Sequence, residues 1–108
     1  MTAQQLSCIL ETVSGIGGRV AMNAFPEGEA PELPWIVYRQ TSANRILADN
    51  RVYYSSPVFV IELYTEVKSP DTEAALEWTL ARNDLIWTKE EEYLDSERCY
   101  MVTYTVTF

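Results

Sequence analysis

Apolar positions along the chain follow two different periods, which meet at residues 67–70. Between residues 57 and 67, apolar side chains alternate with polar or mixed ones, as on a half-buried β-strand. After residue 70, apolar positions recur every three or four residues, as on an amphipathic helix. The apolar face of the strand is predicted to comprise Phe59, Ile61, Leu63 and Val67. The sequence therefore predicts a strand that leads directly into a helix.

The start of this predicted helix carries the usual end signals. Ser69 fits the N-cap position, and Pro70 fits the first helical position, where a missing N–H costs little. Asp71 and Glu73 fall in the first turn, where the helix dipole favours acidic side chains. Farther along, apolar residues form two neighbouring stripes. They are Ala75, Leu76, Thr79 and Leu80 in one stripe, and Trp78, Ala81 and Leu85 in the other.

The N-terminal third of the chain predicts a helix, a strand and a loop. Residues 2–13 have a helical apolar face, and three glycines at positions 15, 17 and 18 end the helix. A phosphate-binding loop is the weaker interpretation of these glycines, because no strand precedes them and no Gly-Lys-Ser/Thr follows. Residues 19–25 predict a strand, and residues 26–34, with three prolines, predict an exposed loop.

Two further regions predict paired strands. Residues 35–54 read as a long hairpin whose tip lies near the turn signal at residues 48–50, although residues 42–50 are ambiguous. At the C-terminal end, residues 86–93 and 98–108 predict two strands joined by a turn. We therefore expect one α+β domain over residues 1–108. Its fold would be a two-layer α/β sandwich, with a mostly antiparallel sheet, two helices on one face and the order α-β-β-β-β-α-β-β.

Composition and charge narrow the function classes. The chain has 108 residues and a net charge of −8, so it does not present the broadly positive surface that nonspecific nucleic-acid binding requires. Three arginines nevertheless lie on or next to the predicted hairpin: Arg39, Arg45 and Arg51. Acidic residues cluster instead at positions 27–32 and 90–97. A solvated surface explains each charge alone, whereas a positive hairpin beside negative edges would suit head-to-tail self-association.

Candidate chemistry is sparse. Histidine is absent, which excludes Ser-His and Cys-His nucleophile systems within one chain and argues against a zinc site. We expect Cys8 and Cys99 to be buried free thiols, and we expect no cofactor and no metal. Glu62, Glu66 and Glu90–Glu92 are candidates for acid–base work, although an exposed acidic face explains them better. Asp71 and Glu73 could contact a cation, but the capped start of a helix explains both. Five tyrosines could form an aromatic platform for a base or a sugar, but they lack basic neighbours, so ordinary sheet packing explains them better; they are Tyr53, Tyr54, Tyr64, Tyr100 and Tyr104. Nothing in the sequence points positively to an enzyme.

Two targeting features are not found in the sequence. No basic segment followed by an apolar run opens the chain, and no apolar run approaches membrane-spanning length. We therefore expect synthesis in the cytoplasm and no membrane partner.

An ordered set of short motifs runs from residue 34 to residue 106. It begins with P-x-I-V-Y-x-x-x-S-x-N at residues 34–44 and A-D-N-x-V-Y at residues 48–53. V-x-V-I-E-L-Y-T follows at residues 58–65, and S-P-D-x-E opens the helix at residues 69–73. Y-M-V-T-Y-T-V closes the set at residues 100–106. In this order the motifs resemble those of small siphophage and prophage tail-completion proteins, also described as tail terminators, head–tail joining proteins or minor tail components.

The resemblance implies a structural role without catalysis. Proteins of that family sit in the neck of the virion, between the head-to-tail connector and the tail tube, often as a ring of six. Their fold is an α/β sandwich, and they offer no catalytic residues to transfer. The implied partners are copies of the chain itself, the tail-tube protein and the connector. The implied location is the virion, after a period in the cytoplasm of the bacterial host.

The charge pattern and the resemblance lead to one contact hypothesis. Three basic residues, Arg39, Arg45 and Arg51, would meet the acids of a neighbouring subunit, namely Glu90, Glu91 and Glu92. The alternative function is that of a small acidic inhibitory or regulatory binding protein of the DNA-mimic type. Arg19, Arg82 and Arg98, which are interleaved among the acids, argue mildly against that alternative.

Overall fold

The computed structural model describes residues 2–26, 28–48 and 51–107, and the side chains of residues 42–57 and 107 are outside this description. The elements follow the order α1 (Ala3–Leu10), β1 (Val20–Met22), β2 (Trp35–Ala48), β3 (Arg51–Thr65), α2 (Pro70–Arg82), β4 (Ile86–Leu94) and β5 (Cys99–Thr107). The expected α+β class is confirmed. One detail differs, because the strands expected at residues 51–54 and 57–67 form the single strand β3.

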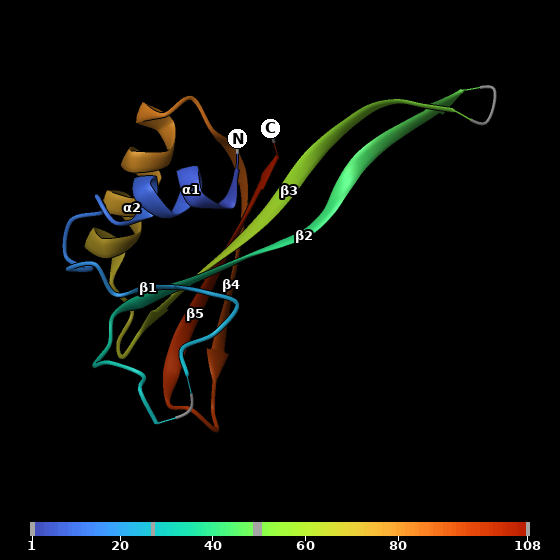
Figure 1. The fold of residues 1–108 in the computed structure, drawn as a ribbon. Helices are drawn as coiled ribbons and strands as arrows, with labels where there is room; N and C mark the ends of the chain where they lie inside the picture. The colour runs from blue at the N-terminus through green and yellow to red at the C-terminus, as the bar shows by residue number, and fades with distance from the viewer. Residues whose placement is uncertain (1, 27, 49–50, 108) are drawn as a thin grey trace.

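The five strands form a mostly antiparallel sheet in the order β1-β2-β3-β5-β4. β1 pairs with β2 in parallel, and the other neighbours pair antiparallel. Both helices lie on the same side of the sheet (Figure 1). The predicted two-layer sandwich is therefore confirmed, and the sheet has a helix-covered face and an open face. The loop between β1 and β2 lies at the lower end of the sheet in this view, next to the turn that joins β4 to β5 (Figure 1).

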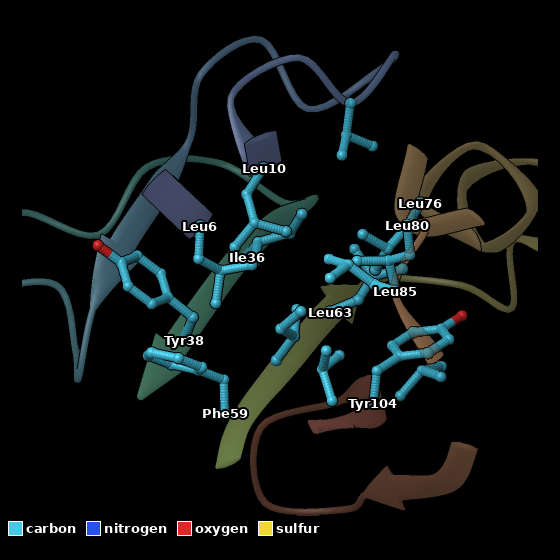
Figure 2. Close-up of a cluster of buried hydrophobic side chains, with 14 of the residues drawn as sticks. Leu6, Leu10, Ile36, Tyr38, Phe59, Leu63, Leu76, Leu80, Leu85 and Tyr104 are labelled. Atoms are coloured by element: carbon cyan, nitrogen blue, oxygen red, sulfur yellow. The ribbon is translucent and has the colours of Figure 1, made fainter. Parts of the chain in front are cut away.

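The hydrophobic core lies between the helices and the sheet. Strand register brings Tyr38, Ile61 and Tyr104 into one row across β2, β3 and β5. Ile36, Leu63 and Val102 form the next row. From the helices, leucine side chains reach down onto these rows (Figure 2). They are Leu6 and Leu10 of α1 and Leu76 and Leu80 of α2. The predicted alternation in β3 and β5 is confirmed, except that Val67 lies beyond the end of β3 and is 68% exposed.

The ends of the helices show what local signals can and cannot specify. Thr2 caps α1 through a reciprocal pair of hydrogen bonds with Gln5. The helix then ends at Leu10, three residues earlier than expected, where the Thr12 hydroxyl donates to the carbonyl of Ile9 at 2.6 Å. α2 starts at Pro70 as predicted.

The second apolar stripe expected on α2 is wrong for two of its three residues, because Trp78 and Ala81 are both exposed. Trp78 is 63% exposed, and the guanidinium of Arg82 lies 5.2 Å from the centre of its ring. Leu85, from the same expected stripe, is buried. The side of α2 that carries Trp78 and Ala81 therefore faces solvent.

β2 and β3 extend well past the rest of the sheet as a two-stranded ribbon (Figure 1). β5 begins to pair with β3 only at Val58, so residues 43–48 and 51–57 pair with each other alone among the described strands. We call these two segments the arm. A register shift between Gln40 and Ala43 marks its base. The long hairpin predicted for residues 35–54 is therefore present, and residues 49–50 of its tip lie outside the described residues.

Candidate functional site

The open face of the sheet carries the candidate site. Strand register places Val37, Glu62, Thr103 and Glu90 in one row across β2, β3, β5 and β4. The adjacent row, closer to the end of β3, contains Trp35, Tyr64, Met101 and Glu92. These rows bring aromatic and acidic side chains together on the face that the helices leave uncovered.

A hollow of ≈380 Å³ lies at one end of this face. The sheet forms its floor, the loop after β1 forms one wall, and the turn between β4 and β5 forms another. Its principal side chains are Phe25, Trp35, Tyr64, Glu62, Glu97 and Cys99. We call this hollow the socket. The loop was predicted to be simply exposed, but Phe25 and Leu33 within it are half-buried against the socket.

Aromatic contacts build the socket wall. The rings of Phe25 and Trp35 meet edge to face, with centroids 5.4 Å apart. Trp35 and Tyr64 lie 6.0 Å apart at a tilt of 47°. Trp35 opens β2 and Tyr64 sits one residue before the end of β3, so the antiparallel register places them directly opposite each other. Local sequence supplies the residues, and strand pairing brings them into contact.

Glu62 is the central acid of the socket. Its side chain is 17% exposed, and its Oε1 lies 3.9 Å from the Nε of Arg39. The Tyr64 hydroxyl donates a hydrogen bond to Glu62 Oε2 at 3.3 Å. Burial, together with the neighbouring carboxylate, raises the pKa of Tyr64 to about 12. Tyr64 therefore stays protonated at neutral pH and acts as a donor.

The structure separates the three glutamates that the contact hypothesis grouped together. Glu90 and Glu92 are exposed on the open face, in the two rows that include the socket residues. Glu91 points to the helix side, where its carboxylate bonds Lys68. Strand alternation alone predicts this division, because consecutive residues of a strand face opposite ways. The sequence alone therefore contained the signal that separates Glu91 from Glu90 and Glu92.

The three arginines of the hypothesis divide in a similar way. Arg39 is exposed on the open face, next to Glu62. Arg45 and Arg51 belong to the arm, where Arg45 pairs with Ser55 and Arg51 with Ala48 along the backbone. The side chains of Arg45 and Arg51 lie outside the described residues.

A separate polar cluster fastens α2 to β4 on the helix side. Glu73, only 4% exposed, accepts contacts from Lys68 Nζ at 2.7 Å and Lys89 Nζ at 2.8 Å. Lys89 also lies 3.0 Å from Glu77, which accepts a hydrogen bond from the Tyr104 hydroxyl at 2.9 Å. Glu73 therefore binds two lysines of its own chain in a buried ion-pair cluster. The sequence had also allowed contact with a free cation.

The pKa values in this cluster move in the directions that favour the charged forms. Burial acts to raise the pKa of Glu73, but hydrogen bonds from Lys68 and Lys89 outweigh burial and lower it. Hydrogen bonding to Glu73 raises the pKa of Lys68 and of Lys89. The Glu73 carboxylate therefore contributes stability that is lost as the pH falls through its lowered pKa. The stability that Lys68 and Lys89 contribute is lost only as the pH rises through the raised pKa values of these two lysines.

Glu73→Gln is therefore expected to destabilise the fold by about 1–3 kcal/mol near neutral pH, because two cations lose their buried partner. The penalty should shrink in acid, where the wild-type carboxylate is itself protonated. Urea unfolding at about pH 7 and about pH 3 measures both effects. Glu90→Gln is the matched control, since Glu90 is exposed and makes no ion pair within the described residues. A penalty independent of pH would contradict the role assigned to Glu73.

The remaining sequence candidates are scattered. Cys99 is buried, as expected, but Cys8 is exposed on α1, and both thiols are free. Burial raises the pKa of the Cys99 thiol. Tyr64 lies on the open face, whereas Tyr100 and Tyr104 belong to the helix-side rows of β5, so these tyrosines form no common platform. Tyr53 and Tyr54 have side chains outside the described residues.

No group of three or more His, Cys, Asp or Glu side chains is placed to hold a metal ion among the described residues. Among these same residues, no helix has the length and apolar character needed to cross a membrane.

Comparisons with known proteins give little beyond shape. No protein-family model matches the chain, and no curated protein matches it. Among solved structures, it is similar to a chain of the "Virion of native gene transfer agent (GTA) particle". The TM-score is 0.48 and the identity 13%, and the match covers 94% of this chain and 81% of that chain. A likeness of this size carries no argument about function.

Proposed function

We propose that this chain is a non-enzymatic structural protein of a phage or prophage virion. It completes or terminates the tail at the head–tail neck and joins the tail to the connector, as a ring of copies of itself. Its partners are then the tail-tube and connector proteins, and six subunits is the ring size in the family that it resembles. The ordered motifs between residues 34 and 106 support this assignment.

The single observation that carries the proposal is the arm. An isolated two-stranded ribbon is marginally stable in water, so a long ribbon projecting from a sheet is best explained by a partner surface that it contacts. The radius of gyration of 15.0 Å exceeds the ~13 Å typical of a chain this long, in keeping with the projection. Such a projecting element suits a subunit that assembles.

The subunit contact follows from the charges. Arg39, Arg45 and Arg51 of one subunit are proposed to meet the acidic strand β4 of its neighbour, which carries Glu90, Glu91 and Glu92. Lys68 of the same chain already binds Glu91, so Glu90 and Glu92 are the members that we expect to contribute most. A contact between two different surfaces of one chain generates a ring when its rotation closes.

Light scattering after size exclusion tests the function. The purified chain is measured over a wide concentration range, alone and with the tail-tube protein of the same phage. The expected result is a ring, or a complex that forms only with the tube protein. A strict monomer that ignores the tube protein would contradict the neck assignment and favour the acidic-binder alternative.

A further inference from the structure

We infer that the socket on the open face holds an arginine side chain from the arm of a neighbouring copy. This inference rests on the proposed ring and names the two surfaces that join its subunits. The occupant is a second copy of this chain, and the recognised group is a guanidinium. The grounds are the chemistry of the socket, its position in the fold and the charge of the arm.

The lining of the socket matches a guanidinium. Trp35, Tyr64 and Phe25 offer aromatic faces, and Glu62 and Glu97 offer carboxylates. No lysine or arginine is among the described residues that line it. Arginine stacks on aromatic rings and donates paired hydrogen bonds to carboxylates, so this combination favours it over an apolar or anionic group. At ≈380 Å³ the hollow is near the small end of ligand pockets, which span about 300–1,000 Å³.

Glu62 retains capacity for a further donor. It receives one hydrogen bond from Tyr64 and lies at the edge of ion-pair distance from Arg39, 3.9 Å away. A carboxylate has about four lone-pair positions for hydrogen bonds. Glu97 adds a second, exposed carboxylate on the turn between β4 and β5. Two acids and three rings converge on a space that no basic side chain of the described residues fills.

The loop after β1 and the turn between β4 and β5, which line the socket, lie at the opposite end of the sheet from the arm (Figure 1). Trp35 opens β2 and Tyr64 lies near the end of β3, so the socket sits where this pair of strands is joined to the rest of the fold. The arm lies at the other end of the same two strands, beyond Val58. This separation prevents an arm from reaching the socket of its own chain. It suits a head-to-tail contact, in which each copy gives an arm and receives one.

Charge complementarity supports the same pairing. Residues 42–57 contain Arg45, Arg51 and a single acid, Asp49, for a net charge of +1, whereas the whole chain carries −8. The open face around the socket carries four acids, Glu62, Glu90, Glu92 and Glu97, which outnumber the one arginine placed beside them, Arg39. A positive arm therefore meets a negative face, which favours this contact over other encounters between copies.

A peptide titration tests the socket directly. The probe is a peptide with the sequence of residues 42–57, flanked by one added cysteine at each end so that an oxidised disulfide closes the hairpin, and it is added to the ¹⁵N-labelled full chain. We expect a saturable shift of the Trp35 indole N–H signal. Trp78 and Trp87 serve as internal controls, because neither is among the socket residues. The same peptide with both arginines replaced by glutamine should bind at least about tenfold more weakly, since it loses charge and stacking together.

A pair of receptor variants sharpens the test. Glu97→Gln removes an exposed acid of the socket and should weaken the arginine peptide about fivefold, as expected for one partly solvated charge pair. Glu11→Gln, at the end of α1 on the helix side, should leave its affinity unchanged. Equal binding of the arginine and glutamine peptides, or no shift at Trp35, would overturn the inference.

Failure of the socket and failure of the ring are distinguishable. A chain that forms rings while the arginine peptide leaves Trp35 unmoved contradicts the socket and leaves the ring function in place. A chain that never assembles, but whose Trp35 signal titrates with the peptide, contradicts the ring and leaves an arginine-binding site.

Discussion

Replacing Arg39, Arg45 and Arg51 together with glutamate is expected to abolish assembly of the chain while leaving the monomer folded. If these residues face acids of a neighbour, reversal converts attraction into repulsion, and like charges across an interface cost several kcal/mol. The concentration at which half of the chain assembles should therefore rise by about a hundredfold or more. Light scattering with tail-tube protein measures assembly, and circular dichroism measures folding.

A double variant isolates the arm. Arg39 lies 3.9 Å from Glu62 in its own chain, so its reversal also perturbs the socket. Arg45→Glu with Arg51→Glu changes the arm alone, and Arg82→Glu reverses an exposed arginine on α2, away from the arm and the socket. The arm pair should lose assembly and the Arg82 control should keep it. Assembly of the triple variant at wild-type level would refute the contact hypothesis.

The largest effect on stability is expected from Ile61→Ala. Ile61 is fully buried at the centre of β3, between Tyr38 and Tyr104 of the neighbouring strands. Removing its methyl and methylene groups loses transfer free energy and leaves a cavity that the sheet closes only in part. The free energy of unfolding should fall by about 2–5 kcal/mol. Urea unfolding at a concentration where the chain is monomeric measures this loss.

Ile86→Ala provides the matched control. Ile86 also lies in a strand, at the start of β4, but it is 80% exposed. The same chemical change there should alter the free energy of unfolding by no more than about 0.5 kcal/mol. Similar losses at both positions would mean that strand propensity, rather than burial under the helices, governs the stability of the sheet.

Several features could be predicted because neighbouring residues determine them. The start of α2 at Pro70 was predicted correctly, since a proline at the first helical position and acids in the first turn act locally. The buried faces of β3 and β5 followed from an alternation that only a half-buried sheet requires. The separation of Glu91 from Glu90 and Glu92 followed from the same alternation, but the contact hypothesis did not apply it.

Other features depended on contacts between distant segments. Cys8 was expected to be buried, but it lies on an exposed side of α1, because the sheet covers only the side that carries Leu6 and Leu10. The hairpin strand at residues 51–54 and the strand at residues 57–67 became a single strand, because continuous pairing with β2 carries the chain through Pro57. Residues from three separate segments, 23–37, 62–64 and 94–99, form the socket. No local sequence pattern predicts that these segments meet.

The sequence by itself determined the class of fold, the faces of the main strands and the absence of histidine chemistry, since periodicity and composition act over a few residues. Only the tertiary structure decided the strand order, the projection of the arm and the meeting of Trp35, Tyr64 and Glu97 in the socket. It also decided that Glu73 is buried between two lysines. The physical reason is that strand pairing and helix packing join residues far apart in the chain, and the free energy of those contacts depends on the whole sheet.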